Sequence, residues 1–245
     1  SLKGTAEREL VRSVTTAPLS SRSVRTRGGC KPEQSKAAAQ AVKSVALCAF
    51  LISMPQLALA ADTTINTAET TTQGPTTPEL NGGDTLTIGP AGTINVTGDN
   101  TKGVSATGGA NTISNSGTIT TDGSRGSDAI AARGEGSNTI INNGAISTQG
   151  NSSRGIFASG NQNTITNTGA ITTVNSAGIR TNLGNQNIIV NSGAITTSGP
   201  GSLGILATGN SNNISNSGSI TTTGVADGAT SADGIYSDGN SNTVT

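Results

Sequence analysis

The sequence contains no histidine and no tryptophan, and its aromatic residues are one tyrosine and two phenylalanines among 245 residues. Without histidine, neither a Ser-His-Asp triad nor a Cys-His catalytic pair can be built. The two cysteines, Cys30 and Cys48, both lie in the first quarter of the chain. The remainder therefore has no thiolate for nucleophilic attack or zinc binding, and it would contain no disulfide after secretion.

Charged residues make up only 11% of the chain, and they are unevenly divided. The formal net charge is zero, but residues 1–61 carry nine Lys and Arg against three acids, whereas the remainder carries five against eleven. An acidic remainder with almost no aromatic side chains argues against nucleic-acid binding. The glycine-rich stretches lack the lysine of a phosphate-binding loop, so a nucleotide site is not predicted either.

The first quarter has the three parts of a secretory signal peptide. A basic region precedes an uncharged stretch whose apolar heart is Val45–Ile52, and the stretch ends in Ala58-Leu59-Ala60. Small residues at Ala58 and Ala60 predict cleavage between Ala60 and Ala61. The alternative is a membrane anchor, because about 18 residues without charge are near the lower limit for a span. Pro55 and the run of small residues favour the signal peptide, which leaves no integral membrane segment in the mature part.

A sequence repeat of roughly 25 residues runs from Leu86 to the end of the chain. Each copy has a central glycine, an isoleucine two residues after it, and an apolar residue four residues before it. The central glycines are Gly92, Gly117, Gly144, Gly169, Gly193 and Gly218. The candidate core residues are Ile113, Ile119, Ile140, Ile146, Ile165, Ile171, Ile189, Ile195, Ile214 and Ile220, with Ile88 and Ile94 in the first copy. The copy is cut off at Thr245, so we expect the natural protein to continue.

A third apolar column follows in each copy, and together the three columns predict a stacked architecture. Its members are Val104, Ile130, Ile156, Ile179, Ile205 and Ile235. The pattern alternates as in strands, is punctuated by turn residues and shows no helical period. One copy cannot bury its few isoleucines alone, but stacked copies can. We therefore predict an all-β, right-handed parallel β-helix over residues 84–245, with a Thr-rich leader or cap at residues 61–83.

An asparagine stands two residues before the central glycine in five copies: Asn115, Asn142, Asn167, Asn191 and Asn216. Stacked side-chain amides can hydrogen-bond along the axis of a solenoid, and Asn is also a common turn residue. We predict a structural ladder rather than a sugar- or ion-binding row, because its neighbours are turn residues.

Two further patterns have a functional and a structural interpretation. Asp227, Asp233 and Asp238 lie in the longest insertion, where calcium binding is possible, but no basic residue accompanies them and we expect solvated turn acids. Neither a metal nor a cofactor is predicted. Threonines recur beside the second isoleucine of each copy, as on ice-binding β-helices, but the column from Thr118 to Ser219 also contains alanines and is irregular. Thr is also simply a favourable residue on exposed strands.

Rungs such as NTITNTGAITT followed by GIxAxG, a signal ending in ALAA and a cysteine-free acidic remainder resemble a known family. Over about residues 44–245 the chain resembles the N-terminal part of a passenger domain of a type V autotransporter from a Gram-negative bacterium. The resemblance implies export across the inner membrane, then secretion through a C-terminal translocator barrel in the same full-length protein, a part that these residues do not include. It also implies a passenger displayed at the cell surface or released.

From this we expect a non-catalytic stalk that contributes to adhesion or host contact, with a host-surface receptor or matrix as its partner. The longest variable turn, Val225–Ala232, is the first place to look for that partner, because loops vary freely where rungs cannot. The alternatives are a polysaccharide-acting β-helix enzyme and an ice-binding protein.

Overall fold

The computed structural model describes residues 61–66, 68–71, 78–134, 136–226 and 231–245. Ala58 and Ala60 of the predicted signal peptide lie outside these residues, as do Asp227 and the middle of the Val225–Ala232 turn. All regular elements of the described part are strands. It therefore offers no helix of the length and apolarity that a membrane span requires.

The strands form three parallel sheets. Sheet A consists of β1 (Asp62–Ile65), β4 (Thr85–Ile88), β7 (Thr112–Asn115), β10 (Thr139–Asn142), β13 (Thr164–Asn167), β16 (Ile188–Asn191), β19 (Asn213–Asn216) and β22 (Thr243–Val244). Sheet B consists of β2 (Ala68–Thr71), β5 (Thr93–Val96), β8 (Thr118–Thr121), β11 (Ala145–Thr148), β14 (Ala170–Val174), β17 (Ala194–Ser198) and β20 (Ser219–Thr222). Sheet C consists of β3 (Glu79–Leu80), β6 (Val104–Thr107), β9 (Ile130–Arg133), β12 (Ile156–Ser159), β15 (Ile179–Asn182), β18 (Ile205–Thr208) and β21 (Ile235–Asp238).

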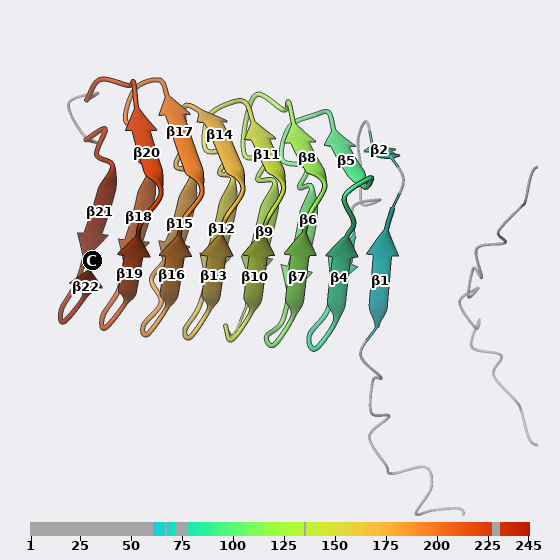
Figure 1. Cartoon of the computed structure of the whole chain (residues 1–245), viewed down its shortest axis with the longest axis horizontal. Coiled ribbons are helices and arrows are strands. Elements are labelled where there is room, and N and C mark those ends of the chain that lie inside the picture. The colour runs from blue at the N-terminus through green and yellow to red at the C-terminus, as the bar shows by residue number, and fades with distance from the viewer. Residues whose placement is uncertain (1–60, 67, 72–77, 135, 227–230) are drawn as a thin grey trace, which may run out of the picture. The chain divides into compact units, whose positions relative to one another are not determined.

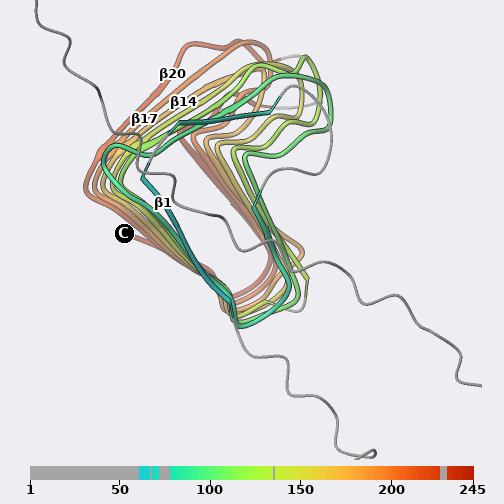
Figure 2. The ribbon, with the colours of Figure 1, turned by 90° about the vertical axis from the view of Figure 1, so that its right-hand side faces the viewer.

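Hydrogen-bonded neighbours in each sheet are three elements apart along the chain, so every rung visits sheets A, B and C once. Figure 1 shows the strands of successive rungs side by side, and Figure 2, along the stack, shows the rungs superimposed. The prediction of a parallel β-helix with rungs of about 25 residues is confirmed. Each rung pairs its backbone with the next, which satisfies the peptide groups that three short strands could not satisfy alone.

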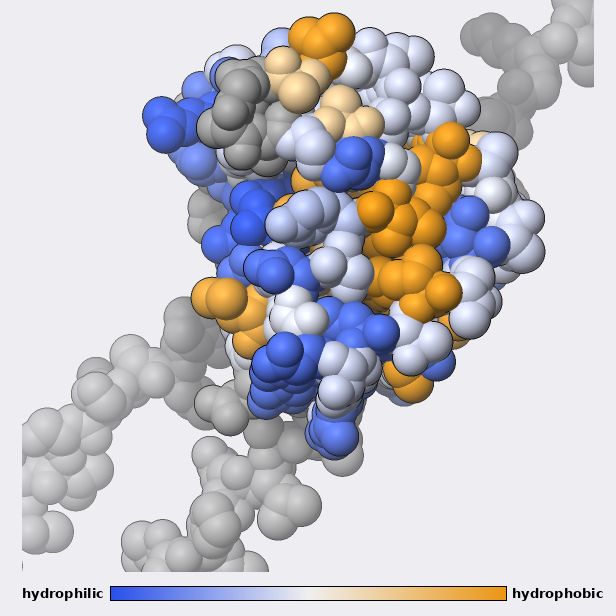
Figure 3. Space-filling model, turned by 90° about the vertical axis from the view of Figure 1, so that its left-hand side faces the viewer, coloured by the Kyte–Doolittle hydropathy of each residue, from blue (hydrophilic) through white to orange (hydrophobic). Residues whose placement is uncertain are grey.

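The isoleucine columns form one continuous core inside the three sheets. In sheet A, Ile140 pairs with Ile113 and Ile165, and in sheet B, Ile146 pairs with Ile119 and Ile171. Nine of the ten candidate core isoleucines are at most 2% exposed, and each contributes about 1.5–3 kcal/mol by burial. The tenth, Ile220, is partly buried against the core. Figure 3 shows hydrophobic side chains gathered on the face at the C-terminal end of the stack.

The assignment of Ile88 to the column of Ile113 is wrong by two residues. Strand β4 places Leu86 beside Ile113, and Ile88 beside Asn115. The cause is the corner that follows: Gly89 to Gly92 form a wider turn, closed by a 2.8 Å hydrogen bond from the Gly92 N–H to the Gly89 carbonyl oxygen. In later copies the corner between the sheet A and sheet B strands is two residues shorter. A fixed distance of four residues from the central glycine therefore gives the wrong residue in β4.

The central glycines are required by close stacking of backbone at the corner between sheets A and B. A Cβ atom on Gly169 would lie 2.0 Å from the carbonyl oxygen of Gly144 in the preceding rung, and Gly117, Gly144, Gly193 and Gly218 have the same clash at 2.0–2.1 Å. None of these glycines needs a positive φ. The repeat therefore keeps glycine at this corner because no side chain fits between adjacent rungs.

Residues 61–83, which the sequence assigns to a leader or cap, supply the first strand of each sheet. β1 pairs in register with β4, β2 with β5 and β3 with β6. Ile65 and Leu80 are buried against the core. This rung covers the edges that β4, β5 and β6 would otherwise expose.

Candidate functional site

The asparagines before the central glycines form an amide ladder, in which the first four are buried and Asn216 is partly buried. Each Nδ2 donates to the Oδ1 of the asparagine in the next rung at 2.7 Å, from Asn115 through Asn142, Asn167 and Asn191 to Asn216. The Nδ2 of Asn167 also donates to the Gly169 carbonyl oxygen at 3.2 Å. Because these amides bond to one another and to the corner backbone, they have little capacity left to bind a sugar or an ion.

A second ladder, at the start of the sheet A strands, escaped the sequence analysis. Its members Asn111, Asn138, Asn163, Asn187 and Asn212 are at most 1% exposed, and successive Nδ2–Oδ1 distances are 3.1 Å. From Asn138 onward, each Oδ1 also accepts the backbone N–H of the asparagine one rung before. The signal was present in the sequence, since each copy begins with one of these asparagines.

Asp84 ends the second ladder toward the N-terminus. Its backbone N–H donates to Asn111 Oδ1 at 3.1 Å. Its carboxylate accepts the backbone N–H of Ala61 at 2.7 Å and that of Asn81 at 2.8 Å. These two N–H donors lower the pKa of Asp84 below its ordinary value. An aspartate suits this position because the ladder here needs only acceptors.

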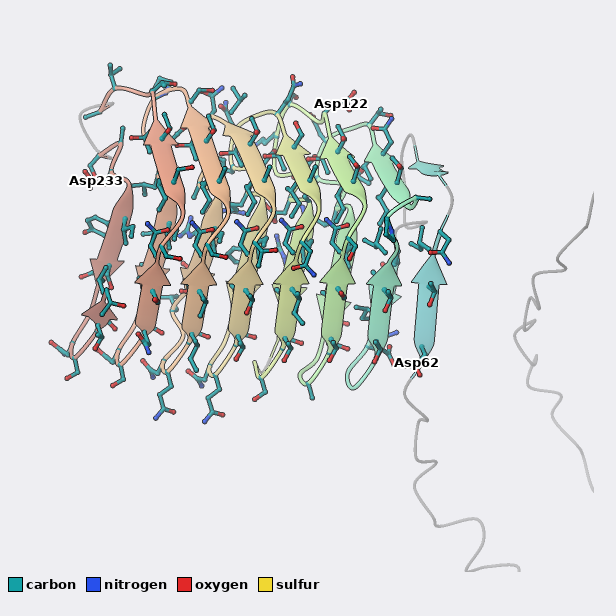
Figure 4. The ribbon with its side chains drawn as sticks, in the orientation of Figure 1. Asp62, Asp122 and Asp233 are labelled. Atoms are coloured by element: carbon teal, nitrogen blue, oxygen red, sulfur yellow. The ribbon has the colours of Figure 1, made fainter. Side chains whose placement is uncertain are left out.

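The acids of the described residues do not gather into a catalytic or metal site. Figure 4 shows Asp62, Asp122 and Asp233 on different parts of the stack. No group of three or more Asp, Glu, Cys or His suited to a metal ion occurs within the described ranges. Asp238 is exposed at the end of β21. The outward face of sheet B alternates Ala, Ser and Thr without a single residue type along a column.

Buried threonines at the ends of the sheet B strands donate hydrogen bonds to the turns between sheets B and C. Thr121 Oγ1 donates to the Ser127 carbonyl oxygen at 2.6 Å, and Thr148 and Thr173 make the same bond to Ser153 and Ser176 at 2.6 and 2.8 Å. Figure 2 shows these turns projecting outward beyond sheet C. The threonines thus hold a row of turns over the outer face of sheet C.

A buried carboxylate beneath these turns binds two arginines. Asp128 is fully buried, and its Oδ1 accepts the Arg154 backbone N–H at 2.9 Å and the Arg154 Nη1 at 3.3 Å. Its Oδ2 accepts Arg133 Nη2 at 3.2 Å. The two guanidinium carbons lie 5.2 and 4.8 Å from the ring centre of Phe157, which is 8% exposed. The ring and the carboxylate therefore hold both arginines in place.

Two more cations adjoin this arrangement. Burial lowers the pKa of the Lys102 ammonium, and Arg133 and Arg154 lower it further, while Asp128 opposes them. Burial likewise lowers the pKa of the Arg180 guanidinium, with Arg154 adding to the effect and Asp128 opposing it. We call Lys102, Arg133, Arg154 and Arg180 the basic cluster; Asp128 is the one carboxylate that pairs with it among the described residues.

Two members of the basic cluster, Arg154 and Arg180, line a pocket of about 410 Å³ on the outer side of sheet C. One turn provides Asn151, the turn of the next rung provides Asn175 and Ser176, and the turn of the rung after that provides Pro200 and Gly201. The sheet provides Arg180 and Leu206 from adjacent strands. The Nη2 of Arg180 donates to Asn182 at 2.9 Å, whereas its Nε is buried and has no hydrogen-bond partner in the part of the chain that the structure describes. The pocket thus offers cationic, amide and hydroxyl groups together with an apolar floor.

The sequence pattern does not predict this site. Its signal is the distribution of bases: of the five Lys and Arg after residue 61, four belong to the basic cluster and only Arg125 does not. Their sequence spacing is irregular because they come from turns and strands of different rungs. The chain itself matches no protein-family model, no curated protein and no solved structure.

Proposed function

We propose that this chain is a non-catalytic passenger stalk of the autotransporter type, displayed at the cell surface or secreted, that contributes to adhesion or host contact. The observation that carries the proposal is the uninterrupted stack of rungs, in which the buried residues serve packing and the ladders. Such a scaffold places a binding surface at a distance from its anchor. A C-terminal translocator barrel in the same full-length protein belongs to this proposal.

The contact of Ala61 supports the proposed cleavage between Ala60 and Ala61. The nitrogen of Ala61 donates to Asp84 Oδ1 at 2.7 Å. Cleavage at this bond would turn that nitrogen into an α-ammonium, so an ion pair would replace a hydrogen bond from a neutral amide to the carboxylate. Ala61 is exposed, so the new terminus would meet no steric obstacle in the first rung.

Export and cell binding test the proposal in one experiment. The chain, joined to a translocator barrel and produced in a Gram-negative host, is expected at the cell surface with Ala61 as its N-terminal residue by mass spectrometry. These cells should bind saturably to cultured host cells or to immobilised matrix proteins, and cells that display the barrel alone should not. The proposal fails if the chain stays inside the cell, or if the displayed chain leaves binding unchanged.

The polysaccharide-cleaving alternative predicts a different result in the same preparation. A lyase or hydrolase would release new reducing ends from an acidic polysaccharide with calcium present. We expect none, because Asp128 is the one described carboxylate that pairs with the basic cluster, and its two oxygens are bound to Arg133 and Arg154.

A further inference from the structure

We propose that the pocket beside the basic cluster binds an acidic glycan, a chain of sugars that carries sulfate or carboxylate groups. The inference rests on the proposed function, because it names the chemistry by which the stalk would contact a surface. The carrying observation is a local surplus of positive charge in a part of the chain whose overall charge is negative.

The charge is arranged for a ligand rather than for internal pairing alone. Asp128 bonds to Arg133 and Arg154, and this accounts for its own burial. Among the described residues, Lys102 and Arg180 form no such ion pair: Lys102 donates to the carbonyl oxygens of Asn100 and Gly126, and Arg180 donates to Asn182. Of these two cations, Arg180 lines the pocket and Lys102 does not. Their partial burial lowers the pKa of each group, which is the effect that a bound anion would reverse.

The other residues that line the pocket suit a sugar chain that carries acidic groups better than they suit a small inorganic anion. Amide and hydroxyl groups of Asn151, Asn175 and Ser176 can exchange hydrogen bonds with ring hydroxyls, and Leu206 offers an apolar surface for the C–H face of a ring. The lining spans three rungs, so it can hold several units of a linear chain. A single-stranded nucleic acid would need several exposed aromatic side chains on which its bases could stack. Two arginines cover Phe157, so Tyr236 is the one exposed aromatic side chain among the described residues of sheet C.

The test compares Arg180→Met with Arg125→Met. Both remove one positive charge, but Arg125 is exposed and does not line the pocket, and neither residue holds Asp128. The probe is a heparin-derived octasaccharide, titrated by calorimetry against the purified full chain. We expect saturable binding that weakens with added salt, a rise in Kd of about tenfold or more for Arg180→Met, and little change for Arg125→Met. Circular dichroism of both variants should match that of the unchanged chain.

Other outcomes overturn the proposal. An equal rise in Kd for the two substitutions would mean that the octasaccharide is attracted to the positive charge of the chain in general and does not bind in the pocket. Competition by sodium sulfate at the same sulfate concentration would mean a site for a simple anion, and equal binding of neutral maltooctaose would mean that charge is unimportant. Tighter binding of a single-stranded oligonucleotide of equal charge would assign the pocket to nucleic acid. If the chain promotes cell binding but does not bind the octasaccharide, the proposed function stands and the acidic-glycan site is wrong.

Discussion

Gly169→Ala is expected to destabilise the solenoid by at least about 3 kcal/mol, although the change adds a single methyl group. The added Cβ would lie 2.0 Å from the Gly144 carbonyl oxygen and 2.8 Å from the carbonyl carbon of Asn143. Both obstacles are backbone, so the rungs must separate at the corner. That separation would also strain the hydrogen bond from the Ala170 N–H to the Gly144 carbonyl oxygen, now 3.1 Å. Urea denaturation followed by circular dichroism measures the loss.

Gly234→Ala is the matched control for this substitution. Among the described residues, a Cβ at Gly234 would meet only the Cγ2 atom of Ile220, at 3.7 Å, and Gly234 does not have a positive φ. The control should change stability by no more than about 1 kcal/mol, with stabilisation allowed because alanine restricts the unfolded chain. Equal losses for the two variants would contradict the close stacking of rungs at the sheet A–B corner.

Asn167→Asp is expected to destabilise the solenoid nearly as much as Gly169→Ala at neutral pH, and much less in acid. One carboxylate oxygen can still accept from Asn142 Nδ2, but the other would replace the amide that donates to Asn191 Oδ1 and to the Gly169 carbonyl oxygen. A buried carboxylate that faces two acceptors is disfavoured, so its pKa in the folded state should rise above the unfolded value of about 3.9. Stability should then fall by up to about 1.4 kcal/mol for each pH unit above that value, until the folded-state pKa is reached.

The pH dependence distinguishes the ladder from simple packing. Below about pH 3.9 the side chain is protonated in both states, so the pH-dependent loss should be absent there. Asn143→Asp provides the control, since Asn143 is exposed and neighbours the ladder residue Asn142. Denaturation midpoints of both variants relative to the unchanged chain, measured from pH 3.5 to 7.5, give the result. Parallel curves for the two variants would argue against a buried amide ladder at Asn167.

The regular parts of this molecule could be predicted from the sequence because one residue type recurs at one place in every rung. Ile140, Ile146 and Ile156 each belong to a column whose period equals the rung, so fold class and core follow together. The first rung escaped because residues 61–83 carry few apolar residues, although Ile65 and Leu80 are buried. Ile88 was misplaced because a wider corner changed the count between strand and glycine.

The candidate site could not be predicted in the same way, because it is made where the repeat breaks. Arg154 and Arg180 each occur once, at positions where other rungs have different residues, and Asp128 shares its rung position with Asp233 alone. Their proximity depends on the rung stacking and on the path of the sheet B–C turns, which buried threonines such as Thr148 fix. A sequence pattern that repeats once per rung does not indicate a cluster that is formed by several rungs and does not itself repeat.

Disulfide formation between designed cysteines tests the stacked register most directly. In a chain with Cys30 and Cys48 replaced by serine, Thr172→Cys and Thr196→Cys occupy paired positions on adjacent rungs of sheet B. Adjacent strands lie about 4.8 Å apart, which a disulfide can bridge, and these two cysteines should crosslink fully in the folded chain under mild oxidation. Ser147→Cys with Thr196→Cys spans two rungs, about 9.6 Å, and should stay reduced. Crosslinking of the second pair, or failure of the first, would contradict the parallel in-register solenoid.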